Sequence, residues 1–200
     1  MLTVNDQFPE FNLNTSEQDG KISSYSVNYD REGNLVQKRG NETIKGKYLV
    51  IFGYPKDFTF VCPSELEAFQ EVREKLEREH NATLLAFSTD SEFCHLGWRK
   101  ADKRIENLEY PLIADPAHTL STSLGTIDKA AGVTLRATFI VDDKGIIRHA
   151  SANDDSVGRN PSEIVRILDR LQTGELCAAC SLGDSVGETL DVDLGGYLSE

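Results

Sequence analysis

Hydrophobic positions are scattered in the first part of the chain and become regular after about residue 47. Residues 12–46 are mainly polar, and their glycines occur where turns are expected. Two short stretches, 21–26 and 34–38, are compatible with strands around a polar turn at 30–34. We therefore interpret residues 12–46 as an N-terminal extension attached to a core that begins near residue 47.

The core begins with a pattern that predicts strand, helix and strand. Residues 48–53 form a continuous apolar run, which is typical of a buried strand. In residues 63–79, apolar side chains recur at spacings of three and four, which predicts an amphipathic helix. Residues 83–88 form a second apolar run. This succession predicts a β-α-β unit with parallel strands.

The rest of the chain predicts elements that complete a layered α/β domain. They comprise a helix, a short strand, a short helix, a hairpin with a turn at 142–145 and a last helix, at residues 91–104, 111–114, 115–124, 133–141 with 146–151, and 161–172. Asn160 and Pro161 open the last helix, and Gly174 ends it.

Composition limits the functions to be considered. The 200 residues are enough for one domain with a proper core. A net charge of -12 argues against nucleic acid and anionic membranes as partners. The sequence has no apolar run of membrane-spanning length, and its N-terminus resembles no secretion signal. We therefore expect a cytoplasmic protein.

Four cysteines are present: Cys62, Cys94, Cys177 and Cys180. In a reducing cytoplasm, cysteines point to catalysis or metal binding rather than to structural disulfides. A zinc site usually needs two close pairs of ligands, and only Cys177 and Cys180 form such a pair. We therefore expect no structural metal.

Cys62 lies where the first apolar run meets the helical segment, with Pro63 at the first predicted helical position. Unpaired backbone N–H groups and the helix dipole favour the nucleophilic thiolate there. A reactive cysteine at this junction, followed by a hairpin and a helix, predicts a thioredoxin-like α/β fold. We expect a central mixed sheet flanked by helices over residues 1–172, including the N-terminal extension, and a separate tail over 173–200.

The spacing Pro55-x-x-x-Thr59-x-x-Cys62 resembles the active-site signature of peroxiredoxins, and residues 57–66 resemble their AhpC-type (alkyl hydroperoxide reductase) subgroup. The resemblance implies that Cys62 attacks a peroxide and becomes a sulfenic acid. It also implies that the Thr59 hydroxyl contacts peroxide and sulfur, while Pro55 shapes the pocket lip. The implied substrates are hydrogen peroxide, organic hydroperoxides and peroxynitrite, reduced without a metal, haem or flavin cofactor.

Arg136 is the one charged residue in the otherwise apolar or β-branched stretch 133–141. A buried charge needs a partner, and a thiolate is suitable. The alternative is an edge-strand arginine that faces water. The resemblance implies that Arg136 is the catalytic arginine of the family.

Glu65 lies in the first turn of the predicted helix, where a carboxylate is favoured. Residues 156–160 resemble the family segment whose arginine, here Arg159, pairs with that glutamate. Such a pair would support the helix start in its reactive form. The alternative is a surface glutamate that caps the helix and an arginine that flanks another.

The tail carries the sulfur that the helix start lacks, because Cys62-Pro63-Ser64-Glu65 holds one thiol where thioredoxins hold two. Gly-Glu-Leu-Cys at 174–177 resembles the resolving-cysteine segment of typical two-cysteine peroxiredoxins. This likeness implies that Cys177 of one subunit forms a disulfide with Cys62 of its partner. Residues 156–180 look most like actinobacterial AhpC, but two residues separate Cys177 from Cys180 instead of one. Cys180 is either a disulfide relay or a spare thiol.

The segment around Cys94 resembles family sequences near the contact between dimers, so we expect packing or interface burial for Cys94, His95 and Trp98. The resemblance implies a homodimer that assembles into a ring of five or six dimers, that is, a decamer or a dodecamer. Without a glycine-rich dinucleotide motif, electrons must come from another protein. An AhpD-type dithiol protein, thioredoxin and an AhpF-type flavoprotein are the candidates.

Two other functions make different predictions. A protein-disulfide oxidoreductase would carry Cys-x-x-Cys at the helix start, and the sequence has Cys62-Pro63-Ser64-Glu65 instead. A ring-forming holdase chaperone would keep its activity after Cys62→Ser. Peroxide reduction fits the motif better than either function, although a holdase role is compatible with it.

Overall fold

The computed structural model describes residues 1–45 and 47–173. Its strands are Phe11–Ser16 (β1), Ile22–Tyr29 (β2), Leu35–Arg39 (β3), Glu42–Lys45 (β4), Tyr48–Gly53 (β5), Ala82–Ser88 (β6), Leu112–Ala114 (β7), Ile127–Asp128 (β8), Val133–Thr134 (β9), Arg136–Val141 (β10) and Ile147–Asn153 (β11). Its helices are Cys62–Arg78 (α1), Glu92–Ala101 (α2), Lys103–Glu106 (α3), Thr119–Leu124 (α4) and Pro161–Thr173 (α5).

One mixed sheet organises the described part of the chain, with strand order β11-β10-β5-β6-β7-β1-β2-β3-β4. Strand β6 pairs in parallel with both β5 and β7, while β10 pairs antiparallel with β5 and β11. The predicted β-α-β unit and hairpin are therefore confirmed. Strands β8 and β9 form a separate small sheet.

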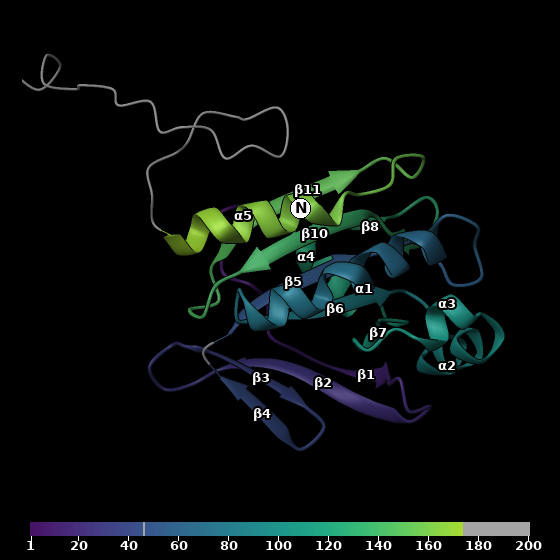
Figure 1. Cartoon of the computed structure of the whole chain (residues 1–200), viewed down its shortest axis with the longest axis horizontal. Coiled ribbons are helices and arrows are strands. Elements are labelled where there is room, and N and C mark those ends of the chain that lie inside the picture. Colours follow the sequence, from purple (N-terminus) through teal and green to yellow (C-terminus); the bar gives the residue numbers. More distant parts are fainter. Residues whose placement is uncertain (46, 174–200) are drawn as a thin grey trace, which may run out of the picture.

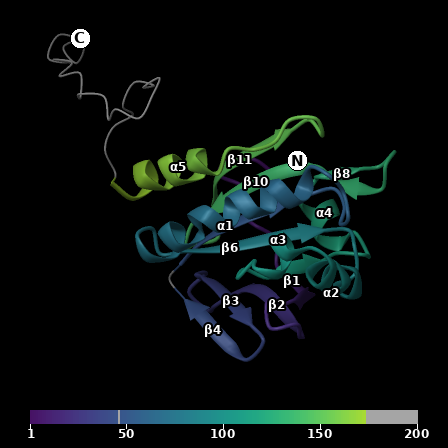
Figure 2. The ribbon, with the colours of Figure 1, turned by 45° about the vertical axis from the view of Figure 1, so that its right-hand side comes forward.

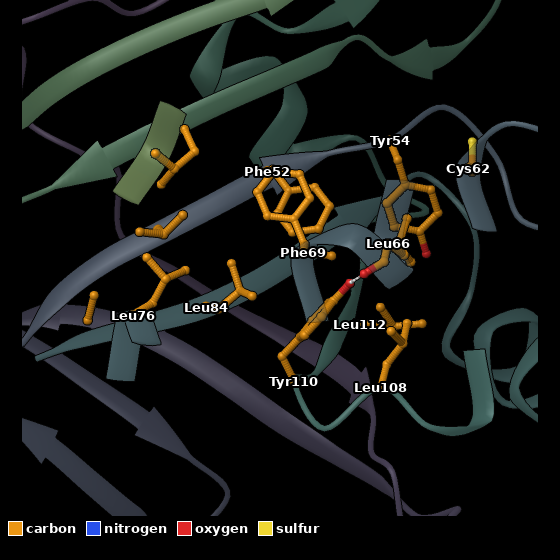
Figure 3. Close-up of a cluster of buried hydrophobic side chains, with 14 of the residues drawn as sticks. Phe52, Tyr54, Cys62, Leu66, Phe69, Leu76, Leu84, Leu108, Tyr110 and Leu112 are labelled. Atoms are coloured by element: carbon orange, nitrogen blue, oxygen red, sulfur yellow. Dashed lines mark hydrogen bonds between the residues drawn. The ribbon is translucent and has the colours of Figure 1, made fainter. Parts of the chain in front are cut away.

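Helices cover both faces of this sheet. Figures 1 and 2 show α1 and α5 side by side over β10, β5 and β6, while α4 lies behind the sheet. On the α1 side, Phe52 and Phe69 stack with ring centroids 3.9 Å apart (Figure 3). The Tyr110 hydroxyl donates to the Leu66 carbonyl oxygen at 2.8 Å, and Cys62 lies at the edge of this cluster (Figure 3). The expected α/β architecture with helices on both faces is thus present.

The N-terminal extension continues the central sheet instead of lying beside it. Strand β1 pairs antiparallel with β7 and with β2, and β3 and β4 follow outward. The sequence predicted strands near β2 and β3 but missed β1 and β4. Strand β1 was missed because it pairs with β7, about a hundred residues away, which local periodicity does not show. Strand β4 was missed because Ile44 is its one apolar residue.

Two predicted elements are divided. The helix expected over 91–104 stops at Asp102, whose backbone is extended (φ -125, ψ 117) and whose carboxylate accepts from the Arg104 N–H. The strand expected over 133–141 is interrupted at Leu135, whose N–H donates to the Thr126 carbonyl oxygen at 2.8 Å. At both places, a hydrogen bond to a nearby segment of the chain interrupts the element that the hydrophobic periodicity predicted.

The short helix expected from residue 115 begins at Thr119. The Asp115 carboxylate accepts from the backbone N–H groups of Leu120 and Ser121, so Asp115 precedes the helix and satisfies its free donors. The intervening His118 has a left-handed backbone with φ 56. In residues 1–45 and 47–173, no helix has both the length and the apolar character that crossing a membrane requires.

Candidate active site

Cys62 is the first residue of α1 and is fully buried. The helix therefore begins one residue earlier than the sequence predicted, with Pro63 in second place and Val61 at the N-cap. The strand β5 delivers the chain to this point from the middle of the sheet. The sulfur thus lies at the start of α1, after a loop that joins β5 to the helix.

Arg136 on β10 brings a cation to this sulfur. Its Nη1 lies 3.6 Å from Cys62 Sγ and 2.8 Å from Glu65 Oε2, and its Nε donates to the Asp155 carbonyl oxygen at 3.0 Å. Only 4% of Arg136 is exposed, so it is not an edge residue facing water. The predicted partner, the Cys62 sulfur, lies beside Arg136 on the neighbouring helix.

The charge of Arg136 is stabilised despite burial. Burial lowers the pKa of this guanidinium, but the hydrogen bond and charge of Cys62, together with Glu65, outweigh it and leave the pKa of Arg136 raised. A guanidinium that stays charged beside a sulfur favours the thiolate.

Glu65 and Arg159 form the predicted pair. Arg159 Nε and Nη2 each lie 2.7 Å from a Glu65 carboxylate oxygen, and the Arg159 backbone N–H donates to Glu65 Oε1 at 3.0 Å. Glu65 is 4% exposed, which excludes the alternative of a surface capping glutamate. Glu65 therefore links two arginines, Arg136 and Arg159, at the start of α1.

Opposing effects act on the Glu65 carboxyl. Burial raises its pKa, but the hydrogen bonds and charge of Arg159, with a smaller contribution from Arg136, leave the pKa of Glu65 lowered. The Arg159 guanidinium carbon also lies 5.0 Å from the centroid of Phe52 and 5.6 Å from that of Phe69. Arg159 thus contacts both the Glu65 carboxylate at the helix start and the aromatic rings of the core.

A pocket of about 410 Å³ opens onto Cys62. It is lined by Pro55, Lys56, Thr59, Phe60, Val61, Cys62, Ala131, Val133, Arg136 and Asp155. Of the residues predicted from the motif, Pro55, Thr59, Cys62 and Arg136 thus meet at one cavity. The Thr59 hydroxyl donates to the Lys56 carbonyl oxygen at 3.2 Å.

Residues that sequence reasoning missed lie on the loop that carries Pro55 and Thr59, and on α2. Asp57, between the two motif residues Pro55 and Thr59, is buried against Tyr54 and His95. A buried carboxylate requires partners, so a buried Asp57 would have indicated that other polar groups lie next to it. The sequence alone gave no indication that His95, 38 positions later, supplies one. His95 and Trp98 are buried, as predicted for core residues.

Cys94 is half-buried on α2 near the same cluster. Burial, followed by the charges of Asp57 and Asp90, raises the pKa of Cys94 to about 12. Ligand atoms of these three residues lie within 4.8 Å of one another, but each carboxylate already accepts hydrogen bonds from neighbouring groups. The arrangement fits packing, the role predicted for Cys94, and gives no support for a metal ion.

Cys177 and Cys180 lie outside the described residues, as does the tail from Gly174 onward. The resolving and relay roles predicted for these thiols therefore stay predictions. The described site contains a cysteine sulfur, a buried cation and an open cavity, which suits attack on a small polarisable bond.

Comparisons with known proteins point in the same direction. The AhpC/TSA family model matches residues 4–150. Alkyl hydroperoxide reductase C of Mycolicibacterium smegmatis is 39% identical over 178 residues, which cover 89% of each chain. Among solved structures, Enterococcus faecalis AhpC superposes with a TM-score of 0.73 at 32% identity, over 90% of this chain and all of that one. Mycobacterium tuberculosis AhpC gives 0.72 at 36% identity, over 89% and 97% of the two chains.

Proposed function

Since the chain belongs to the AhpC/TSA family and is a thiol-dependent peroxidase, we propose that Cys62 is the sulfur that reduces the peroxide. The observation that carries this assignment is the contact of 3.6 Å between Cys62 Sγ and the Arg136 guanidinium at the base of an open pocket. A buried thiol would be inert without such a cation and such an opening.

In the proposed first step, the Cys62 thiolate attacks one peroxide oxygen. An S–O bond forms as the O–O bond breaks, and the sulfur becomes a sulfenic acid. The departing hydroxide or alkoxide takes a proton and leaves as water or an alcohol, and the group that departs from peroxynitrite is nitrite. The Arg136 donors stabilise the charge that moves onto the departing oxygen. Rotation of the Thr59 side chain turns its hydroxyl toward the peroxide, while Pro55 closes one side of the pocket.

In the proposed second step, Cys177 of the partner subunit attacks the Cys62 sulfenic acid. An S–S bond forms, water leaves, and a disulfide joins the two chains. An external dithiol protein then restores both thiols by exchange, either directly or through Cys180. We propose an AhpD-type protein for this reduction, with thioredoxin and an AhpF-type flavoprotein as the other candidates.

The proposed substrates are hydrogen peroxide, organic hydroperoxides and peroxynitrite. The pocket supports this range because apolar residues, including Phe60, Val61 and Val133, line it together with the Arg136 cation. The cation suits the charged oxygens, and the apolar wall suits an alkyl group. No metal or other cofactor takes part in the proposed chemistry.

The proposed assembly is a cytoplasmic homodimer that forms a ring of five or six dimers. Exposed aromatic side chains beside the site support association, because Phe58, Phe60 and Phe93 are 58%, 97% and 68% exposed. Sedimentation of the reduced protein tests the number of dimers. A monomer at micromolar concentration would contradict the proposed assembly.

The decisive test adds one equivalent of hydroperoxide to fully reduced protein and maps the disulfides by non-reducing mass spectrometry. A Cys62–Cys177 bond between two chains is the expected result, and Cys62→Ser should abolish it. A Cys177–Cys180 bond would make Cys180 the relay. If Cys62 stays reduced while peroxide persists, the assignment of Cys62 is wrong.

A further inference from the structure

The loop between β5 and α1 carries Pro55 and Thr59, and Asp57, buried between them, contacts His95 of α2. Asp57 Oδ2 lies 2.7 Å from His95 Nδ1, and Asp57 Oδ1 accepts from the Tyr54 hydroxyl at 2.9 Å. Asp57 is 7% exposed and His95 is fully buried. Its position places Asp57 two residues from each of the two motif residues.

Both ring nitrogens of His95 face oxygen acceptors. Nε2 lies 3.2 Å from the Ile113 carbonyl oxygen on β7, opposite the Asp57 carboxylate at Nδ1. The His95 ring is therefore held between an oxygen of the loop and an oxygen of β7. Burying such a polar pair is a weak source of stability, so its value to the fold lies in the geometry that it imposes.

The backbone of the loop is held as well. The Asp57 N–H donates to Asp90 Oδ2 at 2.9 Å, and the same oxygen accepts from the Ser88 hydroxyl at 2.8 Å. Asp57 is thus fixed through both carboxylate oxygens and its backbone N–H. A loop residue held at three points has little freedom to carry its neighbours away.

The next residue shows that the loop is held in a conformation it would not adopt alone. Phe58 has φ 56, a left-handed backbone that bulky residues rarely adopt. Its ring centroid lies 6.0 Å from that of Trp98. Since His95 and Trp98 are three residues apart on α2, one helix face contacts two consecutive loop residues.

We propose that Asp57 and His95 are a positioning pair through which α2 holds Pro55 and Thr59 against Cys62. The inference rests on the proposed peroxidase function, and it assigns the pair no contact with peroxide. Loss of the pair should leave the Cys62 thiolate and its Arg136 partner in place. The loop would then no longer present Pro55 and Thr59 in the arrangement that peroxide needs.

The test compares two reactions of Cys62 in reduced full-length Asp57→Asn and His95→Gln. The first is oxidation by hydrogen peroxide, followed by the fluorescence of Trp98, the one tryptophan in the chain. The second is alkylation by iodoacetamide, quantified at Cys62 by peptide mass, which needs the thiolate but no peroxide geometry. We expect the oxidation rate constant to fall roughly 10- to 100-fold, because small misplacements have effects of that size. The alkylation rate constant should stay within about threefold.

Asp115→Asn is the matched control. Asp115 is a fully buried carboxylate that accepts several hydrogen bonds, but it lies at α4 and lines no part of the pocket. Its substitution should lower the thermal midpoint and leave both rate constants of folded protein unchanged. If Asp115→Asn lowered oxidation as selectively as Asp57→Asn, a general loss of rigidity would explain the effect and the proposal would be wrong.

Tyr54→Phe covers the case in which Asp57→Asn does not fold. It removes one hydrogen bond to Asp57 and keeps the ring, so we expect a selective fall in oxidation of roughly threefold, the effect of a single modest hydrogen bond. Unchanged oxidation in the folded variants, or equal falls in oxidation and alkylation, would overturn the positioning role. Slow oxidation of the unsubstituted protein would instead overturn the proposed function.

Discussion

Arg99 on α2 and Arg136 on β10 are almost equally buried, with 3% and 4% exposed, yet they face different partners. Arg136 donates to a sulfur, a carboxylate and one carbonyl oxygen at the wall of a pocket. Among the described residues, every oxygen that accepts a hydrogen bond from Arg99 is neutral. These acceptors are the Ser16 hydroxyl and the carbonyl oxygens of Ser16, Ile105, Leu108 and Tyr110.

The two guanidiniums therefore respond oppositely to burial. Burial lowers the pKa of Arg99 below its ordinary value. Burial acts in the same direction on Arg136, but the hydrogen bonds and charge interactions with Cys62 and Glu65 leave its pKa raised. Two equally buried arginines thus have different roles. One arginine joins loops and strands by saturating carbonyl oxygens, and the other keeps a positive charge beside the Cys62 sulfur at the pocket.

The largest effect that we expect is on stability, from Arg99→Met. The substitution removes the Arg99 donor from four carbonyl oxygens and one hydroxyl, of which the Ile105 carbonyl oxygen still accepts from the Leu108 N–H. The free energy of unfolding should fall by about 4 kcal/mol, because each buried group left unpaired costs about 1–3 kcal/mol and such losses are not additive. Urea unfolding measures this change. A peroxide rate constant of the folded variant that fell more than about tenfold would remove the distinction between the two arginines.

Arg136→Met should produce the reverse pattern. Its loss removes the cation at the sulfur, and the rate constant for oxidation of Cys62 should fall by about 100-fold or more, the usual effect of removing one charge-stabilising donor. Stability should change less than in Arg99→Met, because Arg159 still pairs with Glu65. Stopped-flow oxidation and urea unfolding of the same preparation check both halves. Retention of the normal oxidation rate would contradict a chemical role for Arg136.

Acid should weaken the arginine cluster through Glu65. Because the pKa of Glu65 is lowered in the folded state, its stabilising contribution is complete above the unfolded value near 4.5 and is lost as the pH falls through the folded pKa. The free energy of unfolding should decline more steeply between pH 5 and 3 in the unsubstituted protein than in Glu65→Gln, by at most about 1.4 kcal/mol per pH unit for one proton. Parallel declines in the two proteins would show that the Glu65 pairing adds nothing to acid sensitivity.

Cys94 should give the smallest effect. With a pKa of about 12, its thiolate fraction at pH 8 is on the order of one in ten thousand. Iodoacetamide at that pH should modify Cys62 and leave Cys94 intact, as judged by peptide mass. Cys94→Ala should change the peroxide rate constant by less than about twofold. If Cys94 were labelled as fast as Cys62, the neighbouring carboxylates and cations would not explain a difference in reactivity between these two thiols.

Local sequence was sufficient for much of the framework. The apolar run in β5, the helical spacing of α1 and the turn at 142–145 are formed by neighbouring residues, so periodicity predicted them. Cys62 at the helix start followed from the same short stretch, with an error of one residue. The sequence also required a partner for Arg136, because a charge among apolar residues cannot stay unpaired.

Tertiary structure decided which distant groups meet. Strand β10 lies next to β5, which brings Arg136 to Cys62 across 74 positions of sequence, and Arg159 reaches Glu65 across 94. Resemblance to a family, not periodicity, suggested those two meetings. Neither source indicated the pair of Asp57 with His95 or the pairing of β1 with β7. Periodicity records which face of its own element each side chain occupies, whereas partners from other elements are chosen by packing of the whole sheet.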